Sequence, residues 1–453
     1  MKKNKLKNLI DKSFNFIFKR NTLSFSVPYL RQWTGMKRRK LYLEHTAGFS
    51  PWIVISKEIL NNTWFFVALI LIASFLIRVW HLGSIKEEIF DEVYFVKFAQ
   101  NYLTGVSFFD IHPPLGKLII AIGEKIFHNS YLSWRIMESV FGVGVIWLGY
   151  LIGKNLKNKI VGLFTALILA LDGMLLVYSR VGLMDIFMVF FILLGFYAIL
   201  KFAEKSKWYF LMLAGISLAL AASIKYIAGL LILVYLSVWI IKKISLRKNW
   251  PKIIIFILII PAMIYLGFFL FNFPLNKEFI KKVLEWHVQS LNYNLSLKEG
   301  HPYGSKWWSW FLLIRPIWLY FKDIGGKFIC IIGLGNPLAW WASIIVIPTL
   351  VFRMIKKDKT SAIILVSFLI FLIPWAFFKR VLFFYHAMPS FAFLAIGTAY
   401  LLENLLKDKV GKVTVVVFFA ILVFLFIYFL PIWIGSPILS VDFYHRMWLK
   451  SWI

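Results

Sequence analysis

The stretch WFFVALILIASFLIRVWHL, Trp64–Leu82, decides the class of fold. It is almost wholly apolar and carries a single charged residue, Arg78, near its end. A helix needs about 20 mainly apolar residues to cross the hydrocarbon core of a bilayer. We therefore predict that this stretch is a transmembrane helix.

Further runs of the same kind follow along the chain, and with the first they predict about eleven spans. They are Trp134–Gly153, Val161–Tyr178, Ile186–Phe202, Trp208–Ser223, Tyr226–Ile241, Ile253–Phe273, Leu338–Phe352, Ala362–Phe378, Val381–Leu402 and Val413–Trp433. The composition agrees, because the 453 residues are 60% hydrophobic, whereas soluble proteins are about 45–50% apolar. We predict an all-α polytopic membrane protein.

The basic residues indicate how these spans are oriented. The chain has 51 Lys and Arg against 21 Asp and Glu, a net charge of +30, which in a soluble protein would suggest nucleic-acid binding. Here the basic residues gather in short loops on one side, where they mark the cytoplasmic face and meet anionic lipid. The clusters lie at 37–40, 154–159, 205–207, 242–248, 353–359 and 407–412. We expect a cytoplasmic N-terminus and no nucleic-acid partner.

This topology divides the chain into three parts. Residues 1–63 are a basic cytoplasmic extension to which we assign no chemistry. Residues 64–433 are the transmembrane domain, with long outer loops at about 83–133 and 274–335. Residues 434–453 are an outer tail.

The first outer loop holds an unusual group of acidic residues. A solvated acidic loop is the simplest interpretation. However, Asp91 and Glu92 lie in the apolar and aromatic sequence IFDEVYF, where a carboxylate beside a membrane is costly unless it is paired or used. The acidic residues of the loop are Glu87, Glu88, Asp91, Glu92 and Asp110.

The motif HPPLGK, residues 112–117, follows Asp110 in the same loop. Its two prolines fix the backbone and can begin a helix, because proline is tolerated in the first helical turn. The run Leu115–Phe127 is typical of an amphipathic helix at the membrane interface. We expect the Lys117 and Lys125 side chains to extend towards the headgroups.

Polar residues also stand at the outer ends of the predicted spans. Each one alone is more often an interfacial anchor than a site residue. All are predicted on the same side as Asp91, so together they describe a pocket for an anionic lipid headgroup beside a proton acceptor. They are Arg135, the segment 179–185, Lys225, Lys379, Arg380, Tyr385 and His386.

Several blocks of the sequence resemble one known family, in that family's order. FDEVYFVKFAQNYLTGVSFFDIHPPLGKLIIAIG, residues 90–123, is similar to the first outer loop of the protein O-mannosyltransferases (dolichyl-phosphate-mannose–protein mannosyltransferases), which belong to the GT-C class of membrane glycosyltransferases. The ordered set is much more specific than a lone Asp-Glu or His-Pro-Pro. The other blocks are SRVGLMDIFMVFF (179–191), HPYGSKWWSWFLLIRPIWLYF (301–321), GLGNPLAWW (333–341) and RVLFFYHAMPSFAF (380–393).

The length of the second outer loop distinguishes members of this family. Eukaryotic members carry a β-rich MIR domain there, whereas this loop has about 60 residues, fewer than the 100–150 of a typical domain. The chain therefore resembles the compact bacterial and archaeal form. We expect it in a prokaryotic plasma membrane, with its active site outside the cytoplasm.

The resemblance implies the reaction and its two substrates. The donor would be a polyprenyl or dolichyl phosphate carrying β-linked mannose. The acceptor would be a Ser or Thr hydroxyl of a secretory polypeptide, and the reaction would invert the anomeric centre. Because a hydroxyl is a weak nucleophile, it needs a base within reach. The family match gives this role to Asp91, with Glu92 orienting the acceptor or tuning Asp91 through coupled titration.

The leaving group would be a lipid phosphate, whose negative charge grows as the bond breaks. Fixed cations stabilise such a transition state. The candidates are Arg135, from the family match, then Arg380, from its position, and Lys117. The candidates for binding sugar or acceptor are Asp110, His112, Tyr385 and His386.

No obligatory cofactor is predicted. The single cysteine, Cys330, cannot build a disulfide or a Cys-based zinc site within the chain. His287 and His301 lack the spacing of a known metal motif. Because many GT-C enzymes use a divalent metal at the first-loop acid, a metal remains possible.

Two other functions fit part of the pattern. A GT-C relative acting on lipid A, a glycolipid or a cell-wall glycan would share the same scaffold, and sequence alone separates it poorly. A transporter would explain the spans and the outer charges, but it predicts polar residues near the bilayer midplane and repeat symmetry. Such residues are scarce here and no repeat is evident. Nothing in the sequence indicates an oligomeric state.

Overall fold

The computed structural model describes residues 62–453, except for 129 and 298–299. The chain divides into two units, one ending at Ala68 and the other comprising Leu69–Ile453. The second unit contains both outer loops and every candidate site residue. The predicted N-terminal extension, residues 1–63, lies almost entirely outside the described residues.

Every apolar run that was predicted to span the membrane contains helix. In the described part, six helices are long and apolar enough to cross a bilayer, so the predicted total of about eleven spans is not confirmed. The helices of these runs are α3 (Thr63–Val79), α6 (Ile136–Leu156), α7 (Lys159–Ala170), α8 (Gly173–Val177), α9 (Asp185–Lys205), α10 (Trp208–Ala222), η2 (Tyr226–Leu230), α11 (Leu231–Lys242), α12 (Leu246–Ile253), η3 (Ile254–Ile259), α13 (Ile260–Phe268), η4 (Phe269–Phe271), α15 (Pro337–Trp341), α16 (Ser343–Ile355), α17 (Lys359–Leu372), η6 (Ile373–Phe377), α18 (Met388–Leu405) and α19 (Lys409–Ile434).

A buried aspartate explains one of the interruptions. Asp172 separates α7 from α8, and its Oδ1 accepts a hydrogen bond from the Leu175 N–H at 2.9 Å, which caps α8. Its Oδ2 accepts from the Asn336 N–H at 3.0 Å and from the Trp340 indole at 2.7 Å. The carboxylate is fully buried but satisfied, and the predicted run Val161–Tyr178 is therefore two helices.

Two glycines allow α6 and α7 to pack closely. A Cβ on Gly153 would lie 2.8 Å from the Val161 carbonyl oxygen, and one on Gly162 would lie 2.6 Å from that of Tyr150. Small residues allow such close approach between helices in a membrane. Helix α9 packs in turn against α6, α10 and α11. This group of helices supports the outer elements.

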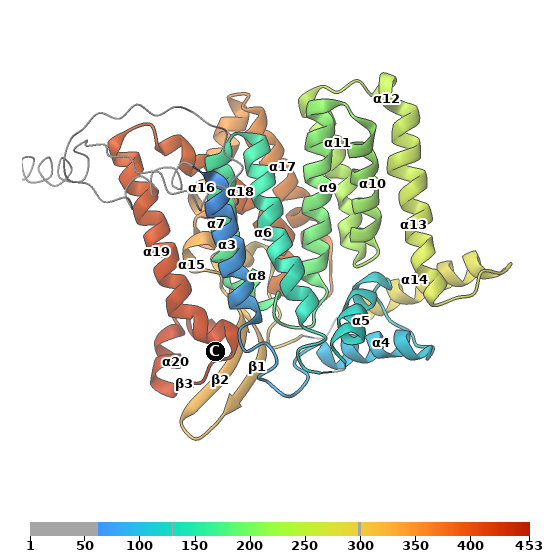
Figure 1. The fold of residues 1–453 in the computed structure, drawn as a ribbon, viewed down its shortest axis with the longest axis horizontal. Helices are drawn as coiled ribbons and strands as arrows, with labels where there is room; N and C mark the ends of the chain where they lie inside the picture. The colour runs from blue at the N-terminus through green and yellow to red at the C-terminus, as the bar shows by residue number, and fades with distance from the viewer. Residues whose placement is uncertain (1–61, 129, 298–299) are drawn as a thin grey trace, which may run out of the picture. The chain divides into compact units, whose positions relative to one another are not determined.

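The outer elements lie at one end of α6 and α9. Figure 1 shows α4, α5, α14 and the β-hairpin gathered there. The bounds of α5 confirm the helix predicted at Leu115–Phe127. The outer elements are α4 (Glu92–Thr104), α5 (Leu115–Phe127), α14 (Phe279–Ser296), η5 (Trp307–Leu312), β1 (Ile317–Asp323), β2 (Lys327–Gly333), η7 (Phe384–Ala387), β3 (Ile438–Leu439), α20 (Ser440–Arg446) and η8 (Lys450–Trp452).

The β-hairpin is an element that was not predicted from the sequence. Strands β1 and β2 pair antiparallel, and the short β3 extends the sheet in the order β1-β2-β3. Gly325 and Gly326 form the turn with φ of 74° and 85°, values that glycine adopts without a steric cost. A Gly-Gly pair between two apolar and aromatic runs is a recognised hairpin signal. The Tyr320 hydroxyl on β1 donates a hydrogen bond to Glu87, which ties the hairpin to the first outer loop.

Helix α14 presents two different apolar faces. Phe279, Val283 and Trp286 are buried in a small cluster with Phe269 of η4. A second, exposed row consists of Ile280, Leu284, Val288, Leu291 and Leu295. An exposed apolar row beside lysine and glutamate is typical of a helix that lies in the membrane interface. The last turn of this helix reaches the cavity of the candidate active site.

Candidate active site

The first feature of the site is a buried ion pair between Glu92 and Arg135. The Arg135 Nε–H donates to Glu92 Oε1 at 2.7 Å, and Nη2 donates to Oε2 at 2.6 Å. The remaining Arg135 donors reach backbone carbonyls of the first outer loop at Leu82, Ile85 and Glu87. Both side chains are almost completely buried. A forked Arg–carboxylate pair of this kind fixes geometry strongly.

The Glu92 carboxylate also accepts two hydrogen bonds from backbone N–H groups. Its Oε1 accepts from the Gly182 N–H at 2.7 Å, and its Oε2 accepts from the Ile89 N–H at 3.0 Å. Gly182 belongs to the turn between α8 and α9, so the carboxylate joins the first outer loop to that turn. Glu92 and Arg135 therefore satisfy each other. This geometry does not support the predictions that Arg135 binds phosphate and that Glu92 contacts the acceptor.

The Lys117 ammonium also makes all its contacts within the protein. It forms an ion pair with Asp110 and donates to the carbonyl oxygens of His112 at 2.7 Å and Pro113 at 2.6 Å. The side chain is fully buried. An ammonium has three donors, and all three have partners. The predictions that Lys117 extends to the headgroups or binds phosphate are therefore not supported, because Lys117 and Asp110 hold the loop together instead.

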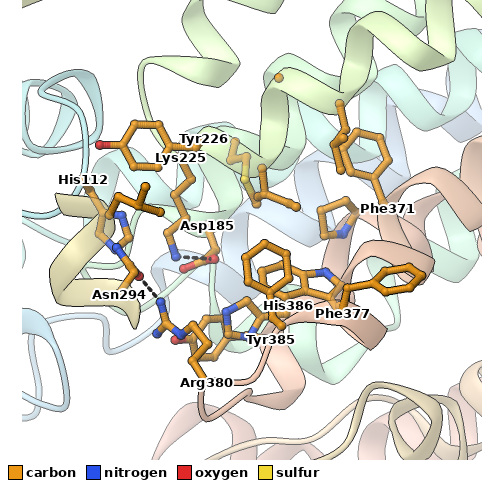
Figure 2. A pocket seen from close by; sticks show the side chains of 18 of the residues that line it. His112, Asp185, Lys225, Tyr226, Asn294, Phe371, Phe377, Arg380, Tyr385 and His386 are labelled. Carbon is orange, nitrogen blue, oxygen red and sulfur yellow. Dashed lines mark hydrogen bonds and ion pairs between the residues drawn. The ribbon is translucent and has the colours of Figure 1, made fainter. Parts of the chain in front are cut away.

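The described residues also enclose a cavity of about 1030 Å³. Most of its wall is apolar and comes from η2, α14, η6 and the segment that precedes α18. Its polar groups gather in one region, where Figure 2 shows Lys225, Asp185, Arg380 and Asn294 facing a common space. The cavity is lined by His112, Asp185, Met188, Lys225, Tyr226, Ile227, Gly229, Leu230, His287, Leu291, Asn294, Leu295, Phe371, Trp375, Phe377, Phe378, Lys379, Arg380, Tyr385, His386 and Pro389.

Lys225 and Arg380 face the polar region of this cavity, which Lys379 also lines. The Lys225 ammonium donates to Asp185 Oδ1 at 2.8 Å and lies 5.1 Å from the centre of the Tyr385 ring. Arg380 donates through Nη1 to Asn294 and through Nε to the Val381 carbonyl at 3.3 Å. Neither contact uses all the donors of its cation. The region can therefore bind an anionic group such as a phosphate.

The Asp91 carboxylate has a different environment from that of its neighbour Glu92. It is half-buried, and no hydrogen bond or ion pair from any described residue reaches it, not even as a cap for α4. Burial raises the pKa of Asp91 to about 6; Lys225 opposes the rise, while Asp185 and Asp110 add to it. Glu92, with which coupled titration was expected, is not among the causes of this shift. The Glu92 carboxylate forms an ion pair with Arg135 instead. A carboxylate with such a pKa can accept a proton near neutral pH.

The backbone before Asp91 is held in an uncommon conformation. Phe90 has a φ of 53°, in the left-handed region that aromatic residues rarely adopt. Such a residue costs of order 1 kcal/mol and persists only where surrounding contacts fix it. The bonds from Glu92 to Ile89 and Arg135 flank this residue. They therefore hold the turn that orients Asp91.

The remaining predicted residues border the cavity in different ways. Burial, with Lys225 and Lys117 nearby, holds the pKa of His112 well below its usual range, so the ring is neutral. Tyr385 lies beneath Lys225. His386 places Nδ1 within hydrogen-bond distance of the Phe383 backbone, so Nε2 is the nitrogen available to the cavity. His112, Tyr385 and His386 thus line the cavity, and their binding of sugar or acceptor stays a prediction, whereas Asp110 is held by Lys117.

Some residues of the site were not predicted. Lys225 and Asp185 were expected only as residues at the ends of spans, and the structure joins them as a pair. Asn294 and Tyr226 gave no signal, because a lone Asn or Tyr near a helix end is common. Among the described residues, no group of three His, Cys, Asp or Glu side chains is placed to hold a metal ion. The need for a metal is a matter for experiment.

The fold has a clear class among solved structures. The yeast protein O-mannosyltransferase Pmt1–Pmt2 complex bound to the sugar donor aligns with a TM-score of 0.77 at 16% identity, covering 86% of this chain and 92% of that chain. ArnT from Cupriavidus metallidurans aligns with a TM-score of 0.53 at 12% identity, covering 76% and 60%. These similarities show that the chain has the fold of the GT-C glycosyltransferases.

The sequence comparisons give the family within this class. A model of dolichyl-phosphate-mannose-protein mannosyltransferases matches residues 68–275, and one of the C-terminal four-span region of protein O-mannosyltransferases matches residues 279–452. The chain belongs to the protein O-mannosyltransferase family.

Bacterial relatives match over most of their length. The polyprenol-phosphate-mannose–protein mannosyltransferase of Corynebacterium glutamicum is 28% identical, covering 76% of this chain and 81% of the relative. That of Mycolicibacterium smegmatis is 25% identical, covering 86% and 93%. The family resemblance found in the sequence is therefore confirmed.

Proposed function

We propose that this protein transfers a mannosyl group from a polyprenyl or dolichyl phosphate to Ser and Thr hydroxyls of secretory polypeptides. The family and the names of its bacterial and yeast relatives support this reaction. The observation that carries the proposal is the Asp91 carboxylate, unpaired among the described residues and electrostatically linked to Lys225. Lys225 and Arg380 face a cavity whose other walls are apolar, as a prenyl phosphate requires.

In this proposal Asp91 acts as the general base. It takes the proton from the acceptor hydroxyl as the hydroxyl oxygen attacks the anomeric carbon. The bond from that carbon to the phosphate oxygen breaks, and the phosphate leaves with the electron pair. Lys225 and Arg380 stabilise the charge that develops on the phosphate. Attack from the face opposite the leaving group inverts the anomeric centre and gives an α-linked mannose.

The other residues hold this arrangement in place. Glu92 and Arg135 fix the turn that carries Asp91, and Asp110 and Lys117 fix the loop that follows it. His112, Tyr385 and His386 border the polar region and are assigned to the sugar and phosphate. We assign catalysis to the transmembrane domain, 64–433, with the N-terminus in the cytoplasm and the outer loops on the other face, as the basic loops indicate.

The experiment that tests the function is a direct transfer assay. Purified protein is incubated with radiolabelled polyprenyl-phosphate-mannose and either a Ser/Thr peptide or lipid acceptors, with and without a chelator. Label in the peptide that is released by alkaline β-elimination supports the proposal. Label only in lipid would assign the chain to another GT-C acceptor class. Loss of transfer with chelator, restored by a divalent cation, would show a metal requirement.

Replacing Arg380 by alanine should lower kcat/KM by about 10²-fold, because one cation opposite the developing phosphate charge is lost. The kinetics are measured with donor concentration varied. The matched control is Lys306→Ala, which removes an exposed cation from the second outer loop and should change kcat/KM by less than about twofold. Equal effects of the two variants would show that Arg380 acts only through general surface charge.

The raised pKa of Asp91 predicts the pH dependence of transfer. A base must be deprotonated, so kcat/KM should rise with pH through about 6 and then level off. Asp185→Asn removes a like charge and frees Lys225, so this limb should move to lower pH. An unmoved limb in Asp185→Asn would contradict the assignment.

The raised pKa of Asp91 also predicts how the stability of the folded protein depends on pH. The folded protein holds the Asp91 proton more tightly than the unfolded chain. The resulting stabilisation is fully present below about pH 3.8 and is lost as the pH rises through about 6.

A further inference from the structure

Asn294 is the partner of Arg380 at the polar end of the cavity. It lies in the last turn of α14, and its Oδ1 accepts a hydrogen bond from Arg380 Nη1. Its Nδ2 donates to the Ser290 carbonyl, one turn earlier, at 2.8 Å. Figure 2 shows the Asn294 and Arg380 side chains meeting beside the Lys225–Asp185 pair. Two segments that are distant in the sequence thus meet through one amide.

The chemistry of its two partners fixes the orientation of this amide. A backbone carbonyl can only accept a hydrogen bond and a guanidinium can only donate. The Asn294 nitrogen must therefore face Ser290, and its oxygen must face Arg380. A flipped amide would place donor against donor and acceptor against acceptor. The amide is locked by its own helix and presents a fixed acceptor to the guanidinium.

Helix α14 is itself anchored beside the site. The Ser290 hydroxyl donates to the Ile111 carbonyl at 2.6 Å and accepts from the Tyr226 hydroxyl at 3.0 Å. The Val381 N–H donates to the Leu297 carbonyl at 3.2 Å. These bonds fix the position of Asn294 relative to both the first outer loop and the segment that carries Arg380.

The partner of Arg380 differs from those of the paired cations around the site. Lys117, Arg135 and Lys225 each form an ion pair with a carboxylate. Among the ion pairs of the described residues, none includes Arg380, whose side-chain partner is a neutral amide. An amide holds a guanidinium in place without cancelling its charge, whereas a carboxylate would cancel it.

We propose that Asn294 is a positioning residue for the reaction: it holds Arg380 against the lipid phosphate of the donor while leaving the guanidinium charge uncompensated. This inference rests on the proposed function, since it concerns the phosphate of that same donor. A carboxylate at this position would strengthen the contact with Arg380 and weaken donor binding. A merely structural role predicts the reverse, because a stronger contact would then be harmless or favourable.

The test is Asn294→Asp, compared with Asn292→Asp as the matched control. Asn292 is exposed on the same helix, so its substitution adds the same charge away from Arg380. With polyprenyl-phosphate-mannose as the probe, Asn294→Asp should raise the donor KM by about tenfold or more and leave the peptide KM within about twofold. Asn292→Asp should leave both within about twofold. Asn294→Asp loses the Nδ2 hydrogen bond to the Ser290 carbonyl, so its unfolding temperature should fall slightly, whereas that of Asn292→Asp should not.

A double-mutant cycle separates action through Arg380 from any other effect. In an Arg380→Ala background, Asn294→Asp should add little to the loss, because the charge that it cancels is already gone. Equal donor KM values for Asn294→Asp and Asn292→Asp, or full additivity in the cycle, would overturn the inference. Failure of the wild-type protein to transfer mannose to peptide would instead overturn the proposed function, independently of these variants.

Discussion

Replacing Asp91 by asparagine should lower kcat for mannose transfer by about 10²–10⁴-fold, the usual contribution of a general base. The side chain keeps its size, and no hydrogen bond from a described residue to its carboxylate is lost. The folded protein should therefore be as stable as the wild type. Donor binding should also persist, because Lys225 and Arg380 are unchanged. Transfer of radiolabel to peptide, with thermal stability and donor binding measured in parallel, checks all three expectations.

The informative comparison is Glu88→Gln. Glu88 is an exposed acid of the same loop, and its substitution removes the same charge without touching the cavity. It should leave kcat within about twofold of the wild type. If Asp91→Asn retained wild-type transfer, Asp91 could not be the base and the proposed mechanism would be wrong.

Replacing Glu92 by glutamine should have the largest effect on stability. It leaves the Arg135 guanidinium buried without a counter-charge, which typically costs about 3–5 kcal/mol. In either orientation the new amide nitrogen would face an Arg135 donor, together with the Ile89 N–H or the Gly182 N–H. The loss is measured as a lower unfolding temperature in detergent or lipid, and activity should fall with it because the turn carrying Asp91 loosens.

A second ion pair provides the control for this prediction. Glu285 and Lys281 lie 3.9 Å apart on the exposed side of α14, and both side chains are more than half exposed. Glu285→Gln should change stability by about 0.5 kcal/mol or less, since water screens such pairs. Equal unfolding temperatures for Glu92→Gln and Glu285→Gln would show that the Glu92–Arg135 pair is not structural.

Adjacent residues illustrate the limit of sequence reasoning best. Asp91 and Glu92 are chemically alike and sit at the start of α4, where successive side chains point about 100° apart. Glu92 therefore faces Arg135, whereas Asp91 points away from it and receives no hydrogen bond from a described residue. The family resemblance gave the role of base to Asp91, but no pattern in the sequence showed that the two carboxylates separate, with Glu92 bound to Arg135. That separation depends on Arg135, 43 positions later, and on a backbone N–H of the turn at Gly182.

The phosphate-binding cations show the same limit. The sequence ranked Arg135 first, from the family match, then Arg380, from its position, and Lys117 third. The structure pairs Arg135 and Lys117 with buried carboxylates and leaves Arg380 on a neutral amide. It also brings Lys225 to the cavity beside Asp185. No local pattern reports such pairings, because each joins segments that meet only after the spans have packed.

The sequence alone determined that this chain is a helical membrane protein, which apolar runs contain helix, and which family it resembles. These features depend on local composition. Long apolar runs are stable in lipid, where a helix satisfies its own backbone hydrogen bonds. Pro113 and Pro114 precede the start of α5. Only the tertiary structure decided which carboxylate remains free, which cations remain unneutralised, and how Asn294 meets Arg380. The physical reason is that the charge state and accessibility of a buried group depend on its partners in space, and those partners come from distant loops gathered at one end of the helices.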